Sequence, residues 1–169
     1  TLIDVYFDFD KSYMFVLDTT SDRIWKLDLT DGDFTTAVYS GDYAALGIGY
    51  GTPVDFYIAD NGIDVYIFDQ GNNEIVQMKM STAWDIPTLS LTTISTLDPS
   101  SEDANSRGFA FSDKGDRIFV VGTSSPDTVY EYVMEELVDL FAGKTKKINY
   151  SNEDCTLIIA DKFLQLSQR

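Results

Sequence analysis

The stretch IADNGIDVYIFDQGNNEIVQMKM (58–80) decides the fold, because it places two apolar strands around a short polar turn. The first expected strand is VYIFD (65–69) and the turn is QGNN (70–73). In the second, EIVQMKM (74–80), the side chains alternate: Val76, Met78 and Met80 point one way, and Gln77 and Lys79 point the other. A period of two residues is typical of a β-strand and excludes a helix here.

The same order of parts recurs in FDKSYMFVLDTTSDRIWKLDL (9–29) and FSDKGDRIFVVGTSSPDTVYEYVM (111–134). Corresponding residues keep a near-constant spacing. Phe15, Tyr66 and Phe119 are 51 and 53 residues apart, and Ile24, Ile75 and Val129 are 51 and 54 apart. The gaps between copies leave room for a further strand, such as LSLTTISTL (89–97). Units of four short strands at a period of about 40–50 residues are typical of propeller blades.

The first copy shows the same alternation. Trp25, Leu27 and Leu29 share one face of the expected strand, and Lys26 and Asp28 share the other. This alternation again favours a strand over a helix.

These patterns predict an all-β fold with about three propeller-blade-like, four-stranded repeats, a partial or open β-propeller. Residues 1–134 form the repeat domain, with repeats at about 1–45, 46–98 and 99–134. The run EELVDLFAGK (135–144) has apolar residues at helical spacing and predicts a short helix. Residues 135–169 are then a C-terminal helix and strand extension, packed on the third repeat or completing it through KINY (147–150) and TLIIADKFLQL (156–166).

Three repeats are fewer than the about 4–8 blades with which propellers close. An open fan of three sheets is the main expectation. Closure through an oligomer, or truncation of a longer chain, are the alternatives. An open fan has apolar end faces and unpaired edges, which predicts burial against a partner.

Composition limits the function. The formal charge of −16 and the pI near 4.1 describe a surface that repels phosphate, so no nucleic-acid partner is expected. With no histidine, Ser-His-Asp and Cys-His catalysis and histidine-ligated metals are excluded. A single cysteine, Cys155, allows no intrachain disulfide and is expected in the core. Lys144, Lys146 and Lys147 are expected in a solvated turn. From the sequence, neither a membrane span nor a signal peptide is expected.

Several tracts suggest chemistry but favour simpler roles. Acidic turns lie at 31–33, 60–64 and 69–74; such loops can bind calcium, but they are also ordinary hairpin turns, and none has the twelve-residue calcium pattern. Pairs among the 28 acidic residues could serve a glycosidase, although chance pairs are expected. GIGYGTPVDFY (47–57) is no phosphate loop. Tyr and Trp side chains could stack on sugars, but filling sheet interfaces is favoured.

The connector STAWDIPTLS (81–90) is expected to be structural. Ser81 or Thr82 would cap a short turn, and Trp84 would cover apolar area of an adjoining sheet. Pro87 would hold Ile86 extended.

FAFSDKGDRIFVVGTSSPDTVYEYVM (109–134) and KMSTAWDIPTLS (79–90) together resemble a repeat of proteins from marine bacteriophages and their metagenomes. That repeat has a D-G type turn, a "VYQY"-like strand and a "LSTAWDIST" tract. The resemblance is strong over about 56–134, weaker over 5–39 and absent after 135. It implies a virion setting and supplies no catalytic residues.

On this basis we expect a non-enzymatic structural virion protein made in the host cytoplasm. It would decorate a capsid as a knob, or belong to the tail, and dock to another virion protein. A host-receptor or glycan-binding module on the virion is the alternative, and a glycan-cleaving enzyme a third. No catalytic, cofactor or metal-binding residue is assigned, no cofactor is expected, and the oligomeric state stays open.

Overall fold

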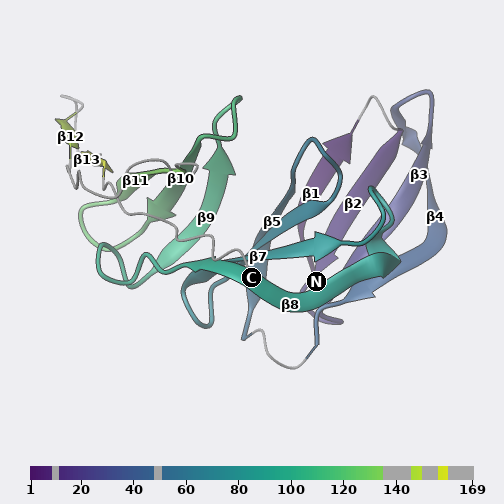
Figure 1. Ribbon diagram of the computed structural model, residues 1–169, viewed down its shortest axis with the longest axis horizontal. Helices are drawn as coiled ribbons and strands as arrows, with labels where there is room; N and C mark the ends of the chain where they lie inside the picture. Colours follow the sequence, from purple (N-terminus) through teal and green to yellow (C-terminus); the bar gives the residue numbers. More distant parts are fainter. Residues whose placement is uncertain (9–11, 48–50, 135–145, 150–155, 160–169) are drawn as a thin grey trace.

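The protein is all-β, as the alternating patterns predict (Figure 1). The computed structural model describes residues 1–8, 12–47, 51–134, 146–149 and 156–159, the last two segments by their backbone. Within these residues the only helical element is a single 3-10 turn, η1 (Ile86–Thr88). The helix expected at 135–144 lies outside the described residues. No described helix has the length and apolarity needed to cross a membrane.

In the first two sheets the strands lie in chain order. The first contains β1 (Leu2–Asp8), β2 (Tyr13–Asp18), β3 (Arg23–Thr30) and β4 (Asp33–Ala45). The second contains β5 (Pro53–Ile58), β6 (Asp64–Asp69), β7 (Glu74–Met80) and β8 (Leu89–Leu97). Every pair of neighbouring strands in these two sheets is antiparallel.

The third sheet also begins with antiparallel strands in chain order, but its remaining strands are arranged differently. The strands β9 (Ser106–Phe111), β10 (Arg117–Gly122) and β11 (Thr128–Val133) are antiparallel. The fourth position is taken by β13 (Thr156–Ile159), which runs parallel to β11, and β12 (Lys146–Asn149) pairs with β13 at the edge. The two C-terminal runs predicted as strands therefore do contain strands, and both belong to the third sheet.

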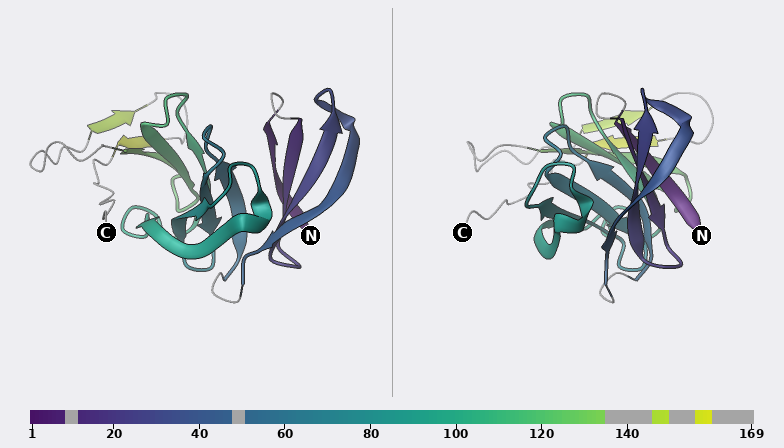
Figure 2. Two further views of the ribbon diagram at one scale, coloured as in Figure 1. Left: turned by 45° about the vertical axis from the view of Figure 1, so that its right-hand side comes forward. Right: turned by 90° about the vertical axis from the view of Figure 1, so that its right-hand side faces the viewer.

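The three sheets lie face against face, with their first strands side by side (Figure 2). The first strand β1 contacts β5, and β5 contacts β9. One apolar cluster fills the junction of the first and second sheets, with Phe15, Leu17 and Ile24 on one side and Ile67 and Met78 on the other. A second cluster fills the junction of the second and third sheets.

The alternation of β7 is confirmed, because Val76, Met78 and Met80 are buried against the first sheet. In β3 the face shared by Trp25, Leu27 and Leu29 is buried only at Leu29. Ile24 is fully buried, whereas Trp25 and Leu27 are only half-buried. The period was right, but the Trp25 side of the first sheet is not covered by another sheet among the described residues.

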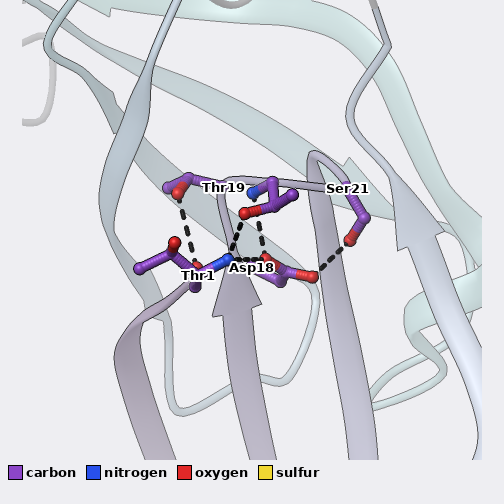
Figure 3. Close-up of polar contacts among 5 residues, drawn as sticks. Thr1, Asp18, Thr19 and Ser21 are labelled. Carbon is purple, nitrogen blue, oxygen red and sulfur yellow. Dashed lines mark hydrogen bonds and ion pairs between the residues drawn. The ribbon is translucent and has the colours of Figure 1, made fainter.

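Hydrogen bonds join Thr1, just before β1, to the turn between β2 and β3 (Figure 3). Asp18 accepts a hydrogen bond from the Thr1 amino group at 2.7 Å and one from the Ser21 hydroxyl at 2.7 Å. The amide of Thr19 donates to the carbonyl of Thr1 at 3.0 Å. The hydrogen bond from the amino group holds the pKa of Asp18 well below its usual range.

The STAWDIPTLS connector covers the neighbouring sheet, as expected. Trp84 lies over Tyr6 and Phe15 of the first sheet with ring centroids 6.4 Å away in each case. Two local expectations are wrong. Ile86 is not extended but begins η1, and the hydroxyl that closes the turn belongs to Thr88, which donates to the carbonyl of Asp85 at 2.7 Å.

Candidate functional site

Two aspartates at the same repeat position fasten the first strands of neighbouring sheets. Asp4 on β1 and Asp55 on β5 are 51 residues apart. Asp4 Oδ2 accepts the backbone N–H of Phe56 at 3.0 Å, and Asp55 Oδ2 accepts that of Phe109 at 2.7 Å. The third repeat has Gly108 at this position, 53 residues after Asp55. The first two sheets therefore each offer a carboxylate to the next sheet, and the third offers none.

The carboxyl groups of Asp4 and Asp55 also form a hydrogen bond with each other. Burial is the main cause that raises the pKa of Asp55 to about 7, and the hydrogen bond that its protonated carboxyl donates to Asp4 adds to the rise. A hydrogen bond between two carboxyl groups requires one proton. Asp55 can therefore be protonated near neutral pH, which is a property of acid–base groups.

A pocket of about 250 Å³ lies between the second and third sheets, next to the β5–β6 turn and the β9–β10 turn. Its apolar part is an aromatic cluster, in which the centroid of the Phe111 ring lies 4.8 Å from that of Tyr57 and 4.6 Å from that of Tyr66. Polar residues from the two turns complete the lining: Asp60, Asn61, Asp113, Lys114 and Gly115. We call this the Tyr57–Tyr66 pocket. Among its lining residues Lys114 is the only cation.

The hydroxyls of the pocket stay protonated. Burial, together with the charge of Asp64, raises the pKa of Tyr66 to about 12. Burial and the charge of Asp60 also raise the pKa of Tyr57. Both phenols can therefore donate and accept hydrogen bonds at any physiological pH.

The acidic turns serve the backbone. Asn61 Oδ1 accepts the amides of Ile63 and Asp64 at 2.8 and 3.0 Å, which is an Asx-type turn. Asp69 is fully buried, and its carboxylate accepts the amides of Thr52 and Gly71 at 2.7 and 3.0 Å. Across the described part of the chain, no three acidic or cysteine side chains gather as a metal site would require.

Other residues noted in the sequence cannot be placed. Cys155 and Lys144 lie outside the described residues, and the side chains of Lys146 and Lys147 are not described.

Sequence reasoning missed both features of this region. The Asp4–Asp55 pair had a usable signal, since the two residues share one repeat position, but only if the first strands are aligned. The pocket gave a weaker signal, because Tyr57 and Tyr66 do fill a sheet interface, as expected, and form the pocket where that interface opens.

No known protein family matches the chain, and no curated protein matches it. The predicted phage resemblance therefore stays a prediction.

Solved structures share the fold. A protein from Bacteroides uniformis, described as a proposed 6-phosphogluconolactonase, superposes with a TM-score of 0.57 at 16% identity, covering 83% of this chain. A second such protein, from Bacteroides fragilis, gives 0.56 at 15% identity over 80% of the chain. A protein from Lactobacillus plantarum gives 0.55 at 18% identity over 79%. The chain spans only 38–39% of the length of these structures.

This likeness corrects the functional expectation. A non-enzymatic virion protein of capsid or tail is contradicted, since two structures that share the fold are named for an enzyme activity. The prediction that the chain is no enzyme loses its support for the same reason. At 15–18% identity, however, the comparison shows a shared fold and leaves the activity of this chain to be argued from its own residues.

Proposed function

We propose that the three sheets are blades of a β-propeller-like fold whose Tyr57–Tyr66 pocket binds a small, neutral, polyhydroxylated ligand such as a sugar or a sugar lactone. The blade assignment is supported by the two four-stranded sheets, by the adjacency of β1, β5 and β9, and by structures more than twice as long that share the fold. Ligand pockets occur preferentially where structural units meet.

The observation that carries the proposal is that aromatic side chains line one part of the pocket and polar side chains of the two turns, its rim, line the rest. The rings of Tyr57, Tyr66 and Phe111 line the pocket, and the two tyrosine hydroxyls are protonated. A sugar ring has apolar C–H faces that pack on aromatic rings, and hydroxyls that need both donors and acceptors. Asp60 and Asn61 add oxygen acceptors at the rim. At about 250 Å³, the pocket suits one ring rather than a chain of sugars.

Charge decides between neutral and anionic ligands. The rim has two carboxylates, Asp60 and Asp113, against one ammonium, Lys114, within a chain of net charge −16. A phosphate group would be repelled by this field. The ligand is therefore a neutral sugar or lactone, even though two similar structures are named for a phosphorylated one.

Calorimetric titration with glucose, gluconolactone and phosphogluconate tests this proposal. We expect binding of a neutral probe, weaker or no binding of phosphogluconate, and an affinity about threefold to tenfold lower for Tyr66→Phe, which loses one hydroxyl. Tyr39→Phe, on the first sheet, is the matched control and should bind as the wild type does. A Tyr66→Phe variant with unchanged affinity, or no heat from any neutral probe at about 10 mM, would contradict the proposal.

Lactone hydrolysis is a second candidate, favoured by the proton held by the Asp4–Asp55 pair. Asp55 lies two residues before Tyr57 on β5, hence on the same side of the strand, although it is not itself a lining residue of the pocket. The ionised carboxylate would take a proton from water, which attacks the lactone carbonyl. The ring C–O bond breaks, and the protonated partner gives its proton to the leaving oxygen, yielding a hydroxy acid.

A pH-stat assay with gluconolactone separates binding from hydrolysis. The hydrolase candidate requires a rate above that of buffer and its loss in Asp55→Asn. A rate equal to that of buffer would leave this protein a binding module.

A further inference from the structure

The first sheet has an apolar face, on the side away from the second sheet, that no other sheet of the described residues covers. The side chains of Leu2, Val16, Trp25, Leu27 and Tyr39 line a shallow hollow of about 380 Å³ there. We call this the Trp25 face. Trp25 also contacts Tyr39 and Tyr43, with ring centroids 5.3 and 5.1 Å away, so aromatic surface extends across it.

The equivalent residues of the second and third repeats show what packs against such a face. The positions of Val16, Trp25 and Leu27 are occupied in the second repeat by Ile67, Val76 and Met78, and in the third by Val120, Tyr130 and Tyr132. All six of these residues are buried: the first three belong to the cluster shared with the first sheet, and the last three to the cluster shared with the second. The preceding sheet covers this face in both cases, so the Trp25 face matches a sheet of the same kind.

The described chain carries the complementary face on its third sheet. In the first sheet the residues that cover the next sheet include Leu17, and in the second Phe68, both fully buried. The third sheet has Val121 at this position, and it is 44% exposed. Phe119 and Val129 flank it at the positions of Phe15 and Ile24.

We propose that a second copy of this chain docks on the Trp25 face through the Val121 side of its third sheet. The contact repeats the geometry of the two internal junctions, and it is head-to-tail because different faces meet. Two copies would bring together six sheets, within the about 4–8 blades of closed propellers. This inference extends the proposed blade arrangement and does not depend on what the Tyr57–Tyr66 pocket binds.

The backbone at both faces fits a junction without a carboxylate. Phe56 and Phe109 each donate their N–H to an aspartate of the preceding sheet, and Val5 stands at their position in the first sheet. The Val5 N–H already donates to its own neighbour Asp4, at Oδ1, at 2.8 Å. On the other side, Gly108 has no carboxylate to offer. At this backbone position, therefore, neither face leaves a hydrogen-bonding group unmatched when the two meet.

The expected area is adequate for a specific dimer. Four strands about 4.8 Å apart and six residues long, at about 3.3 Å per residue, cover roughly 400 Å² in projection. A closed pair uses two such contacts, or roughly 800 Å² per copy, the size of a standard interface. Each copy has a charge of −16, so salt should strengthen the association by screening repulsion.

Sedimentation velocity over a range of concentrations tests the proposal with three variants. We expect a concentration-dependent dimer that tightens with salt. Trp25→Glu and Val121→Glu should each weaken it at least about 100-fold, since each places a charge in an apolar contact. Leu91→Glu is the matched control, because Leu91 is also 44% exposed but lies on β8, away from both faces, and its dimer should match the wild type.

A mixing experiment distinguishes head-to-tail docking from its alternatives. Trp25→Glu keeps an intact third sheet and Val121→Glu keeps an intact Trp25 face, so a mixture should form heterodimers through one contact. Circular dichroism of each variant establishes that it is folded. Wild-type chain that stays monomeric at every concentration and salt level, a dimer unaffected by Val121→Glu, or variants that do not complement each other would overturn the proposal.

Discussion

Replacing Asp55 by asparagine should make the protein more stable at neutral pH, although a buried acid is often assumed to be needed. Asparagine has nearly the same shape as a protonated aspartic acid. Its oxygen can accept the Phe109 N–H, and its amide can donate to Asp4, as the proton of the pair does now. Unlike aspartate, it never carries a charge into the junction.

The magnitude follows from the pKa of Asp55, which rises from 3.8 in an unfolded chain to about 7 in the folded one, mainly through burial. The folded protein then binds this proton more tightly than the unfolded chain does. Its contribution to stability is complete below about pH 4 and is lost as the pH rises towards 7. At about 1.4 kcal/mol per pH unit, the loss approaches roughly 4 kcal/mol. Asp55→Asn should therefore match the wild type at pH 4 and exceed its free energy of unfolding by up to about 4 kcal/mol at pH 8.

Urea unfolding at several pH values between 4 and 8 measures this difference directly. The general repulsion within a chain of charge −16 also changes with pH, but it is common to both proteins apart from one charge. Asp28→Asn, at an exposed position of β3, removes the same charge and should change stability by no more than about 0.5 kcal/mol. An Asp55→Asn variant that is less stable than the wild type at pH 8, or whose stability follows the same pH curve, would refute the reasoning.

Two further predictions concern the connector that crosses the first junction. Trp84→Ala should lower the free energy of unfolding by about 3–5 kcal/mol in urea titrations, because the ring lies over two aromatic residues of the first sheet; exposed Leu91→Ala is its control, and a variant that unfolds like the wild type would contradict this packing role. Gly62→Ala should cost clearly more than Gly115→Ala in the same assay. Both glycines have positive φ, at 66° and 69°, but a Cβ on Gly62 would lie 2.3 Å from Trp84 Nε1, while Gly115 has nothing within 4 Å. Equal losses for the two variants would mean that Trp84 moves away without cost.

The all-β fold was predictable because strand alternation is a local property. The repeat spacing of 51 to 54 residues also marked the strands of each sheet. Which side of a strand is buried was not predictable, as Trp25 and Val76 show: they share a repeat position, yet only Val76 has a sheet over it. Burial of that position depends on the presence of a neighbour, which the alternation within one strand does not encode.

The candidate site was not predictable for a related reason. Among 28 acidic residues nothing in the composition distinguishes Asp4 and Asp55, whose pairing arises only when two first strands lie side by side. Tyr57 and Phe111 likewise meet across two sheets that are separated in sequence. Ile86 illustrates a smaller limit, since the preference of residues before proline for extended backbone gave way to the hydrogen bonds of a tight turn.

The positions of the chain's two tryptophans give it two separate optical probes. Trp84 belongs to the second repeat but lies on the rings of the first sheet, so its fluorescence reports whether these two sheets are together. Trp25 stands half-exposed beside the guanidinium of Arg23, 5.1 Å from its ring centre, so its emission reports the environment of the outer face. With Trp25→Phe and Trp84→Phe, the emission spectrum resolves internal separation of the sheets from events on the outer surface, without any added label.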